Sequence, residues 1–301
     1  MATRNFEKAP ASLPLMLKAA LPAIPLVGGL PGIRHATDKV PNLVLTRNGV
    51  TTDPHHLEKY DEVCGFARSD RLPVTYPHLA AFGLHMTLMT DTSFPFAPMG
   101  LVHLRNTINQ HRPIGLDEVF NVAVHAESLR PHPKGRLIDI VTTATIDGEL
   151  VWDETMTLFS RGNPPQAGGS TIGSKGTTKA PLEGVDAPVG VLHWKAKPDL
   201  GRRYGSVSGD RNPIHLYPLT AKAFGFRSNI AHGMWAKARC LAALQNKLPD
   251  VYRVDVEFRK PILLPNTVIF GAEETDSGYV FGVTSGKEPL THVVGQIVAT
   301  E

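Results

Sequence analysis

The residues best suited to chemistry are Asp210 and His215, which stand five positions apart in a segment rich in turn-forming residues. Pro213 lies between them and restricts the backbone, which predicts a stiff loop with a fixed separation of the two side chains. A carboxylate and an imidazole held in this way can exchange protons near neutral pH and so activate a water molecule. The alternative without a catalytic role is an aspartate that stabilises a turn, followed by a solvent-exposed histidine.

A second chemical feature follows at Gly233, where a mainly apolar stretch predicts a long helix over residues 233–248. Glycine in the first turn lets a ligand approach the backbone closely. The free N–H groups and the positive end of the helix dipole favour negative charge at that end. A carbonyl oxygen placed there would be polarised, so the segment offers an oxyanion site after the proton-handling pair.

The elements that must position these residues occur in the same order in both halves of the chain. A matching apolar helix is predicted over residues 77–89 of the first half. A turn bearing Pro113 follows it, as a turn bearing Pro261 follows the second helix. Helices that are apolar on most sides are expected to be buried by the strands that follow them.

A β-rich meander completes each half, over residues 119–160 and 267–300. Asp147–Gly148 predicts a tight hairpin in the first meander, and residues 276–278 predict a turn in the second. The pattern predicts an α+β fold in which an antiparallel sheet curls around one long helix in each half.

Residues 163–190 are dominated by Gly, Pro, Ser and Thr and predict a linker between the halves. The apolar stretch over residues 13–33 is broken by four prolines and Lys18, which argues against a signal peptide or a membrane span. We therefore expect an N-terminal arm over residues 1–40, a first unit over 41–162 and a second unit over 191–301.

The segment SGDRNPIHLYPLTAKAFGF, followed by IAHGM, resembles the hydratase-2 motif of MaoC-like dehydratases, also called R-specific enoyl-CoA hydratases. The first half, with LPVTYPHLAAFGLHM, is similar to the degenerate half of double-hotdog members and lacks the D-x-N-P-x-H pattern. The resemblance implies a double hotdog, in which two antiparallel sheets each wrap around a long central helix. It assigns catalysis to the second unit and the shaping of an acyl tunnel to the first.

The resemblance also implies roles for individual residues. Asp210 and His215 would be the acid/base pair for reversible hydration of trans-2-enoyl thioesters, equivalently dehydration of (R)-3-hydroxyacyl thioesters. The N–H of Gly233 would bind the thioester oxygen, and Asn212 would brace the loop. Further support or substrate contacts are expected from Ser208, Tyr204 and His232. The substrate would be a thioester of CoA or of acyl carrier protein, with no metal or other cofactor.

Two positions depart from the family pattern, namely Asn229, where many relatives have proline, and Leu241, where single-hotdog relatives have serine. These departures affect the expected fine geometry rather than the class. Two rival functions stay open, a hotdog acyl-thioesterase and a non-catalytic acyl-thioester binding module.

Composition and short motifs argue against several other classes of function. Lys and Arg total 31 against 28 Asp and Glu, for a net charge of +3, and their scatter argues against a nucleic-acid binder. Cys64 and Cys240 lie far apart, which predicts free thiols and is typical of the reducing cytoplasm. GGSTIGSKGTT fails the spacing of a phosphate loop, and His55–His56 is expected to be a surface pair. A monomer and a homodimer are both compatible with a two-unit chain.

Overall fold

The structure, a computed structural model, describes residues 1–20, 38–162, 182, 184–286 and 290–300. The strands are β1 Ala2–Asn5, β2 Leu43–Val50, β3 Val102–Gln110, β4 Phe120–His132, β5 Gly135–Ile146, β6 Glu149–Arg161, β7 Leu192–Ala196, β8 Tyr252–Phe258, β9 Asn266–Thr275, β10 Gly278–Ser285 and β11 Leu290–Ala299. The helices are α1 Ser12–Ala20, α2 Pro54–Cys64, α3 Tyr76–Met89, α4 Leu200–Ser208, α5 Pro213–Leu216, α6 Pro218–Ala223, α7 Gly233–Leu244 and the short 3₁₀ helix η2 Gln245–Lys247.

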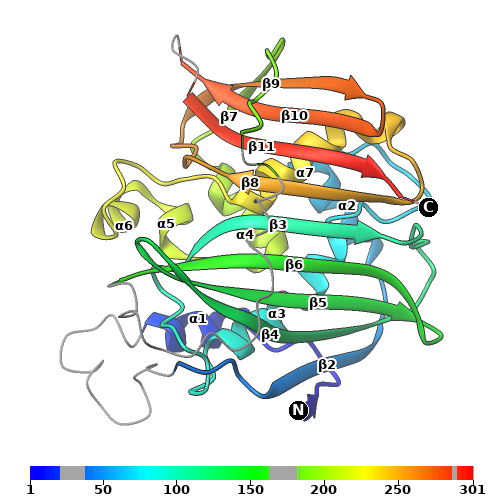
Figure 1. Cartoon of the computed structure of the whole chain (residues 1–301), viewed down its shortest axis with the longest axis vertical. Helices are drawn as coiled ribbons and strands as arrows, with labels where there is room; N and C mark the ends of the chain where they lie inside the picture. Colours follow the sequence, from blue (N-terminus) through cyan, green and yellow to red (C-terminus); the bar gives the residue numbers. More distant parts are fainter. Residues whose placement is uncertain (21–37, 163–181, 183, 287–289, 301) are drawn as a thin grey trace.

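These strands form one sheet in the order β1-β2-β4-β5-β6-β3-β8-β11-β10-β9-β7, as Figure 1 shows. Neighbouring strands are antiparallel except β1 and β2, which are parallel. The two halves of the chain meet at the pair β3–β8, which runs from Arg105 opposite Glu257 to Gln110 opposite Tyr252. We call this strand pair the seam.

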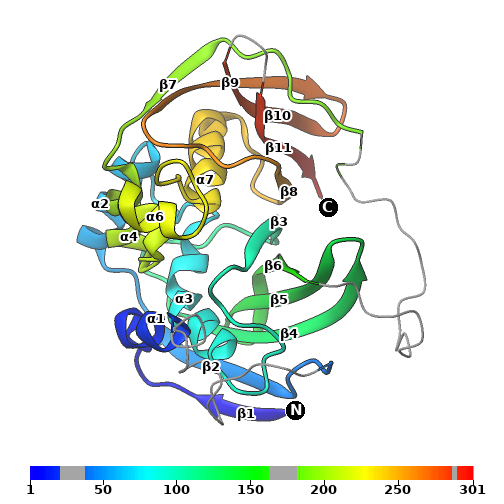
Figure 2. The same ribbon diagram turned by 90° about the vertical axis from the view of Figure 1, so that its left-hand side faces the viewer.

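Each half has an apolar helix followed by a meander, but the second helix is shorter than the predicted 233–248, because α7 ends at Leu244 and the chain continues as the 3₁₀ helix η2. The two long helices are α3, with 14 residues, and α7, with 12, and most of their side chains are buried. The predicted hairpin at Asp147–Gly148 is confirmed, because both residues have positive φ, at 50° and 85°. Figure 2 shows α3 and α7 inside the curve of the sheet, with α2 and α4 on their outer side.

The expectation of two separate sheets, each around its own helix, is not confirmed. Hydrogen bonding across the seam makes the strands of both halves parts of the same sheet. The physical reason is that β3 and β8 would otherwise each present an unpaired edge to solvent.

The ends of the predicted units fall partly outside the described residues. Most of the linker predicted over 163–190 lies outside them, as do residues 21–37 of the predicted N-terminal arm. The described part of that arm forms β1, which pairs with β2, and α1, which packs on α3. Among the described helices, none is both long and apolar enough to cross a lipid bilayer.

Candidate active site

Asp210 lies in the short loop between α4 and α5, and this loop is formed by local signals. Gly209 ends α4 with a φ of 77°, a conformation that glycine adopts easily. The side chain of Asn212 accepts from the amide of Ile214 and caps the first turn of α5. His215 follows within α5, so the predicted turn places both chemical residues on one rigid corner of the fold.

Two glycines of α4 bring this corner close to the helix. A Cβ added at Gly201 would come within 1.9 Å of the carbonyl oxygen of His215. A Cβ added at Gly205 would come within 2.7 Å of the carbonyl oxygen of Asp210. Sequence reasoning missed both glycines, because their role depends on packing between segments rather than on a local motif.

The hydrogen bonds of His215 decide which of its nitrogens faces the site. Nδ1 lies 2.8 Å from the carbonyl oxygen of Ile230, and a carbonyl can only accept. The proton of the neutral ring is therefore on Nδ1, and Nε2 keeps its lone pair. Nε2 lies 4.0 Å from Oδ2 of Asp210, which is too long for a direct hydrogen bond and suits one water in contact with both.

Asp210 presents one carboxylate oxygen to this space and binds the backbone with the other. Oδ1 accepts from the amide of Asn212 at 3.0 Å. Oδ2 lies 3.7 Å from Nε2 of His232, which also contacts the carbonyl oxygen of Asp210 at 2.9 Å. The rings of His215 and His232 stack with centroids 3.6 Å apart. The structure therefore brings the three side chains together.

Burial sets the protonation of the cluster. Burial opposes ionisation of Asp210, but contacts with His232, His215 and the amide of Asn212 outweigh it and hold the pKa of its carboxyl below the ordinary value. Burial lowers the pKa of His215, although Asp210 opposes this shift. Burial and the neighbouring His215 lower the pKa of His232 to about 3. An ionised Asp210 beside a neutral His215 is the state that these shifts favour near neutral pH.

Gly233 is the first residue of α7, directly after His232. The amides of a first helical turn have no acceptor within the helix. The ring of Phe258 covers the side of Gly233 where a Cβ would stand, at 3.1 Å. Since His232 stacks on His215, the start of α7 directly contacts the segment that carries Asp210 and His215, which we call the Asp–His corner.

The other residues predicted to support the site also lie here. Ser208 accepts from the amide of Asp210 at 3.2 Å through its hydroxyl oxygen. Tyr204 is buried with its ring 4.9 Å from that of His232. Asn229, one of the departures, is buried, and its amide nitrogen donates to the carbonyl oxygen of His215 at 3.2 Å. The asparagine thus holds the backbone of the predicted catalytic histidine, a role that sequence reasoning missed.

A second buried polar cluster lies between α3, β3, β6 and α7, and it was not predicted. The fully buried carboxylate of Glu154 accepts a hydrogen bond from Nδ1 of His78 at 2.8 Å and another from the side-chain amide nitrogen of Asn106 at 2.7 Å. Lys237 of α7 donates to the side-chain oxygen of Asn106 at 2.5 Å. His85 contacts the hydroxyl of Thr142 nearby. A sequence signal was present, because His78, His85 and Lys237 stand inside two mainly apolar helices.

Among the described residues, two clusters contain metal-ligand side chains with donor atoms within 4.8 Å of one another, namely Asp210, His215 and His232, and His78, His85 and Glu154. In the first cluster, one nitrogen of each histidine already contacts a backbone carbonyl. In the second, the Glu154 carboxylate already binds His78 and Asn106, and Lys237 brings a positive charge beside it. In the first cluster Nε2 of His232 already donates to a carbonyl, which leaves two ligand atoms, Nε2 of His215 and Oδ2 of Asp210; in the second cluster Lys237 and His78 already compensate the carboxylate, and we assign neither cluster to a metal.

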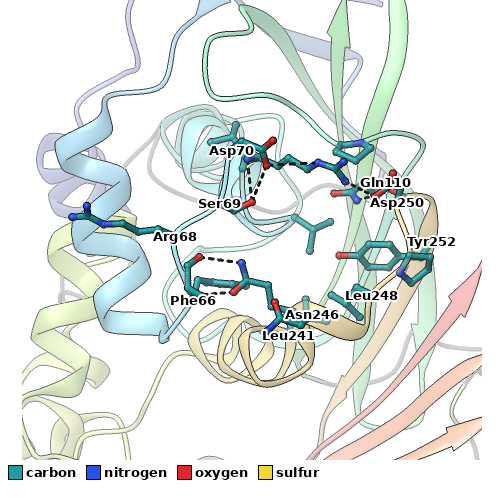
Figure 3. Close-up of a pocket in the computed structure, with 17 residues that line it drawn as sticks. Phe66, Arg68, Ser69, Asp70, Gln110, Leu241, Asn246, Leu248, Asp250 and Tyr252 are labelled. Atoms are coloured by element: carbon teal, nitrogen blue, oxygen red, sulfur yellow. Dashed lines mark hydrogen bonds and ion pairs between the residues drawn. The ribbon is translucent and has the colours of Figure 1, made fainter.

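A cavity of about 310 Å³ opens at the other end of α7, away from the Asp–His corner. Figure 3 shows Ser69 and Asp70 of the first half across this cavity from Leu241 and Asn246 of the second half. Arg71 on its rim pairs with Asp250. Leu241, the second departure, is fully buried against this cavity rather than beside Asp210.

The histidine pair expected on the surface is split by the fold. His55 is exposed, but His56 contacts the hydroxyl of Tyr76 and the carbonyl oxygen of Val207, each at 2.8 Å. The expectation was therefore wrong for His56, which joins α2, α3 and α4 close to the site.

Three arginines of the second half, Arg202, Arg203 and Arg259, have partners within the chain. Arg202 donates to the carbonyl oxygen of Leu216, and Arg203 pairs with Glu62. Arg259 donates to the carbonyl oxygen of Val185.

Comparison with known proteins identifies the family of the chain. The family model described as MaoC like domain matches residues 178–296. The 3-hydroxyacyl-thioester dehydratase X of Mycobacterium tuberculosis is 36% identical over 288 residues, which cover 96% of this chain and 98% of the relative. The crystal structure of HtdX from the same organism matches with a TM-score of 0.73 at 32% identity, covering 85% of this chain and 100% of that one.

A MaoC-like dehydratase from Phytophthora capsici matches with a TM-score of 0.67 at 19% identity, over 87% of this chain and 96% of that one, and it shares the fold. Fold and sequence together place the chain among the hydro-lyases, a class of enzyme that adds or removes water. Within that class, the chain belongs to the MaoC-like dehydratase family.

Proposed function

We propose that this enzyme catalyses the reversible hydration of trans-2-enoyl thioesters to (R)-3-hydroxyacyl thioesters. The observation that carries the proposal is the convergence of Asp210, His215 and the first turn of α7, through the stacked His232. The thioester would be carried by CoA or by acyl carrier protein. The name of the Mycobacterium tuberculosis relative, a 3-hydroxyacyl-thioester dehydratase, supports this substrate class.

The geometry supports a mechanism that uses only the chain and one water. A water between Oδ2 of Asp210 and Nε2 of His215 can donate to both acceptors, which leaves its lone pair free to attack the β-carbon. As the C–O bond forms, the π electrons move toward the thioester oxygen, where the amide of Gly233 would stabilise the negative charge. The pair takes a proton from the water and returns one to the α-carbon, so its protonation is unchanged after the cycle.

In this proposal the second half supplies the catalytic residues. The first half shapes the acyl tunnel and packs against the second half. We interpret the single sheet as two hotdog units joined edge to edge at the seam, with α3 and α7 as their central helices. The first unit, over 41–162, has no acid/base loop of its own. The second unit, over 191–301, has the whole proposed set.

The proposal is tested with crotonyl-CoA. The wild type should consume the enoyl absorbance without releasing free thiol, and Asp210→Asn and His215→Ala should each lower kcat by about 10²- to 10⁴-fold. The matched controls are Asp153→Asn and His111→Ala, because these residues form another Asp–His pair, 2.7 Å apart, outside the site. Both controls should retain activity.

Three outcomes would contradict the proposal. If turnover is unchanged in both Asp210→Asn and His215→Ala, the proposed acid/base mechanism is wrong. Release of free thiol at the rate of substrate loss would indicate an acyl-thioesterase, and binding of the thioester without any turnover would indicate a binding module.

A further inference from the structure

A buried chain of polar side chains crosses the seam, and the mechanism above does not use it. Lys237 is fully buried, and its Nζ donates to the side-chain oxygen of Asn106 at 2.5 Å, to the carbonyl oxygen of Asn106 at 3.2 Å and to that of Val254 at 3.3 Å. Asn106 donates to Glu154, which also accepts from His78. We call Lys237, Asn106, Glu154 and His78 the seam chain.

Lys237 links the seam chain to the face of α7 that carries the proposed oxyanion site. Residues 233 and 237 are one helical turn apart and share a face of α7, and helical side chains lean toward the N-terminus. The stem of Lys237 therefore covers the turn that begins at Gly233. Gly233 itself rests on the ring of Phe258 in β8, while Nζ of Lys237 binds carbonyl oxygens of both seam strands. The first two turns of α7 therefore pack directly against β3 and β8.

The contacts of Lys237 with the seam strands hold the start of α7 in place because the side chain is charged. An ammonium group with three acceptors in the interior cannot shift along the strands without losing contacts that water cannot replace there. Burial lowers the pKa of Lys237 to about 7, while Glu154 and Asp255 favour its charged form and Arg253 opposes it. Burial lowers the pKa of His103 in β3, and the neighbouring His78 and the charge of Lys237 contribute to the same shift. The charged lysine adds positive potential on the side of the helix start where negative charge would develop.

We propose that Lys237 is a positioning residue for the oxyanion site, held in place by the seam chain. Its contacts set the height and rotation of the first turn of α7, and hence the direction of the Gly233 amide. The first half, which has no acid/base loop, would contribute to the reaction through Asn106 and Glu154. The inference rests on the proposed function.

The direct test is the absorption spectrum of bound hexa-2,4-dienoyl-CoA, which moves to longer wavelength as its thioester carbonyl is polarised. The wild type should show this shift, and Lys237→Met should reduce it. The same variant should lower kcat on crotonyl-CoA by up to about 100-fold, the size expected for an ångström-scale misplacement, with a smaller change in KM. A residue that only stabilises the fold would not change the spectrum of the bound ligand.

The pH profile gives a second readout that does not depend on Lys237→Met folding. In the wild type, kcat should fall as the pH rises through the pKa of Lys237, because the charge under α7 is lost. Glu154→Gln removes an anion that favours the ammonium, so the fall should move to lower pH. Arg239→Met is the control: it removes a cation from α7 that lies over the ring of Trp194, and it should keep the wild-type spectrum and profile.

The outcomes separate the two proposals. A wild type that does not hydrate crotonyl-CoA would overturn the proposed function. An active wild type whose spectral shift and pH profile are unchanged by Lys237→Met would overturn only the role of Lys237. If that variant does not fold, an unmoved pH profile in Glu154→Gln would have the same consequence.

Discussion

Two backbone carbonyls control the proton positions at the residue scale. The carbonyl oxygen of Ile230 accepts a hydrogen bond from Nδ1–H of His215, and that of Asp210 accepts one from Nε2–H of His232. His215 therefore faces Asp210 with a lone pair, while His232 faces it with a proton. Two histidines of the same cluster thus have opposite roles, because each is oriented by a different segment of main chain.

The Gly233 amide can be removed with little disturbance of the helix. Proline is tolerated at the first position of a helix, and the extended backbone of His232, with ψ 140°, suits a residue before proline. Gly233→Pro should lower kcat by about 10²- to 10³-fold, as expected for loss of one oxyanion donor. The control is Gly233→Ala, which places a Cβ against Phe258 but keeps the N–H. Equal activity of the two variants on crotonyl-CoA would argue against the oxyanion role.

The charge of Asp210 should be measurable on His215. Burial lowers the pKa of His215 below its ordinary value of 6.5, and Asp210 partly restores it by favouring the imidazolium. Asp210→Asn removes the negative charge, so the pKa of His215 should fall further, and the ring should stay neutral to lower pH. NMR titration of the His215 ring measures the change. A rise in this pKa would mean that the two side chains do not interact as the structure indicates.

At the scale of elements, the site depends on how closely α4 and α5 approach. Alanine for glycine in a helix ordinarily stabilises it by about 0.5–1 kcal/mol. At Gly201 the contact decides instead, because the added Cβ would overlap the carbonyl oxygen of His215. The two helices would have to separate, and His215 would move with α5.

Gly201→Ala should therefore destabilise the enzyme by about 1–3 kcal/mol, the usual cost of overpacking, and should also lower turnover. Denaturant unfolding and the crotonyl-CoA assay measure the two effects. Gly162→Ala is the control, since a Cβ at that position meets nothing within 4 Å. A stabilised Gly201→Ala with full activity would show that α4 and α5 are not closely packed.

Elements with a local signal could be predicted, and those made by distant contacts could not. The Asp147–Gly148 hairpin, the two apolar helices and the stiff turn at Pro213 follow from residues next to one another. Asn229 and Lys237 acquire their roles only from partners elsewhere in the fold. The seam was missed for the same reason, because strand pairing between the halves depends on which edges are left open once each meander has formed.

At the scale of the whole molecule, the seam makes the halves dependent on each other. Each seam strand has one neighbour in its own half, β6 for β3 and β11 for β8, and one across the seam. Separation of the halves would expose a full row of unpaired backbone groups on each. Lys237 would also lose both of its acceptors on Asn106, which would leave its charge with one acceptor, the carbonyl oxygen of Val254.

Fragments 1–162 and 191–301 should consequently not fold as separate monomers. Expressed alone, each should aggregate or unfold without a cooperative transition, while the full chain melts cooperatively. Size-exclusion chromatography and calorimetry distinguish these states, with the full chain as the reference. A monomeric 191–301 fragment that hydrates crotonyl-CoA would contradict both this prediction and the proposed contribution of the first half.

The order in which the seam strands are synthesised has a consequence for biogenesis. β3 leaves the ribosome long before β8, by on the order of ten seconds at ordinary rates of translation. Throughout that interval the nascent first half has an open strand edge, because β8, the native partner of β3, has not yet been made. The yield of active enzyme in a cell should therefore depend on elongation speed and chaperone supply during this window, more than on the stability of the completed protein.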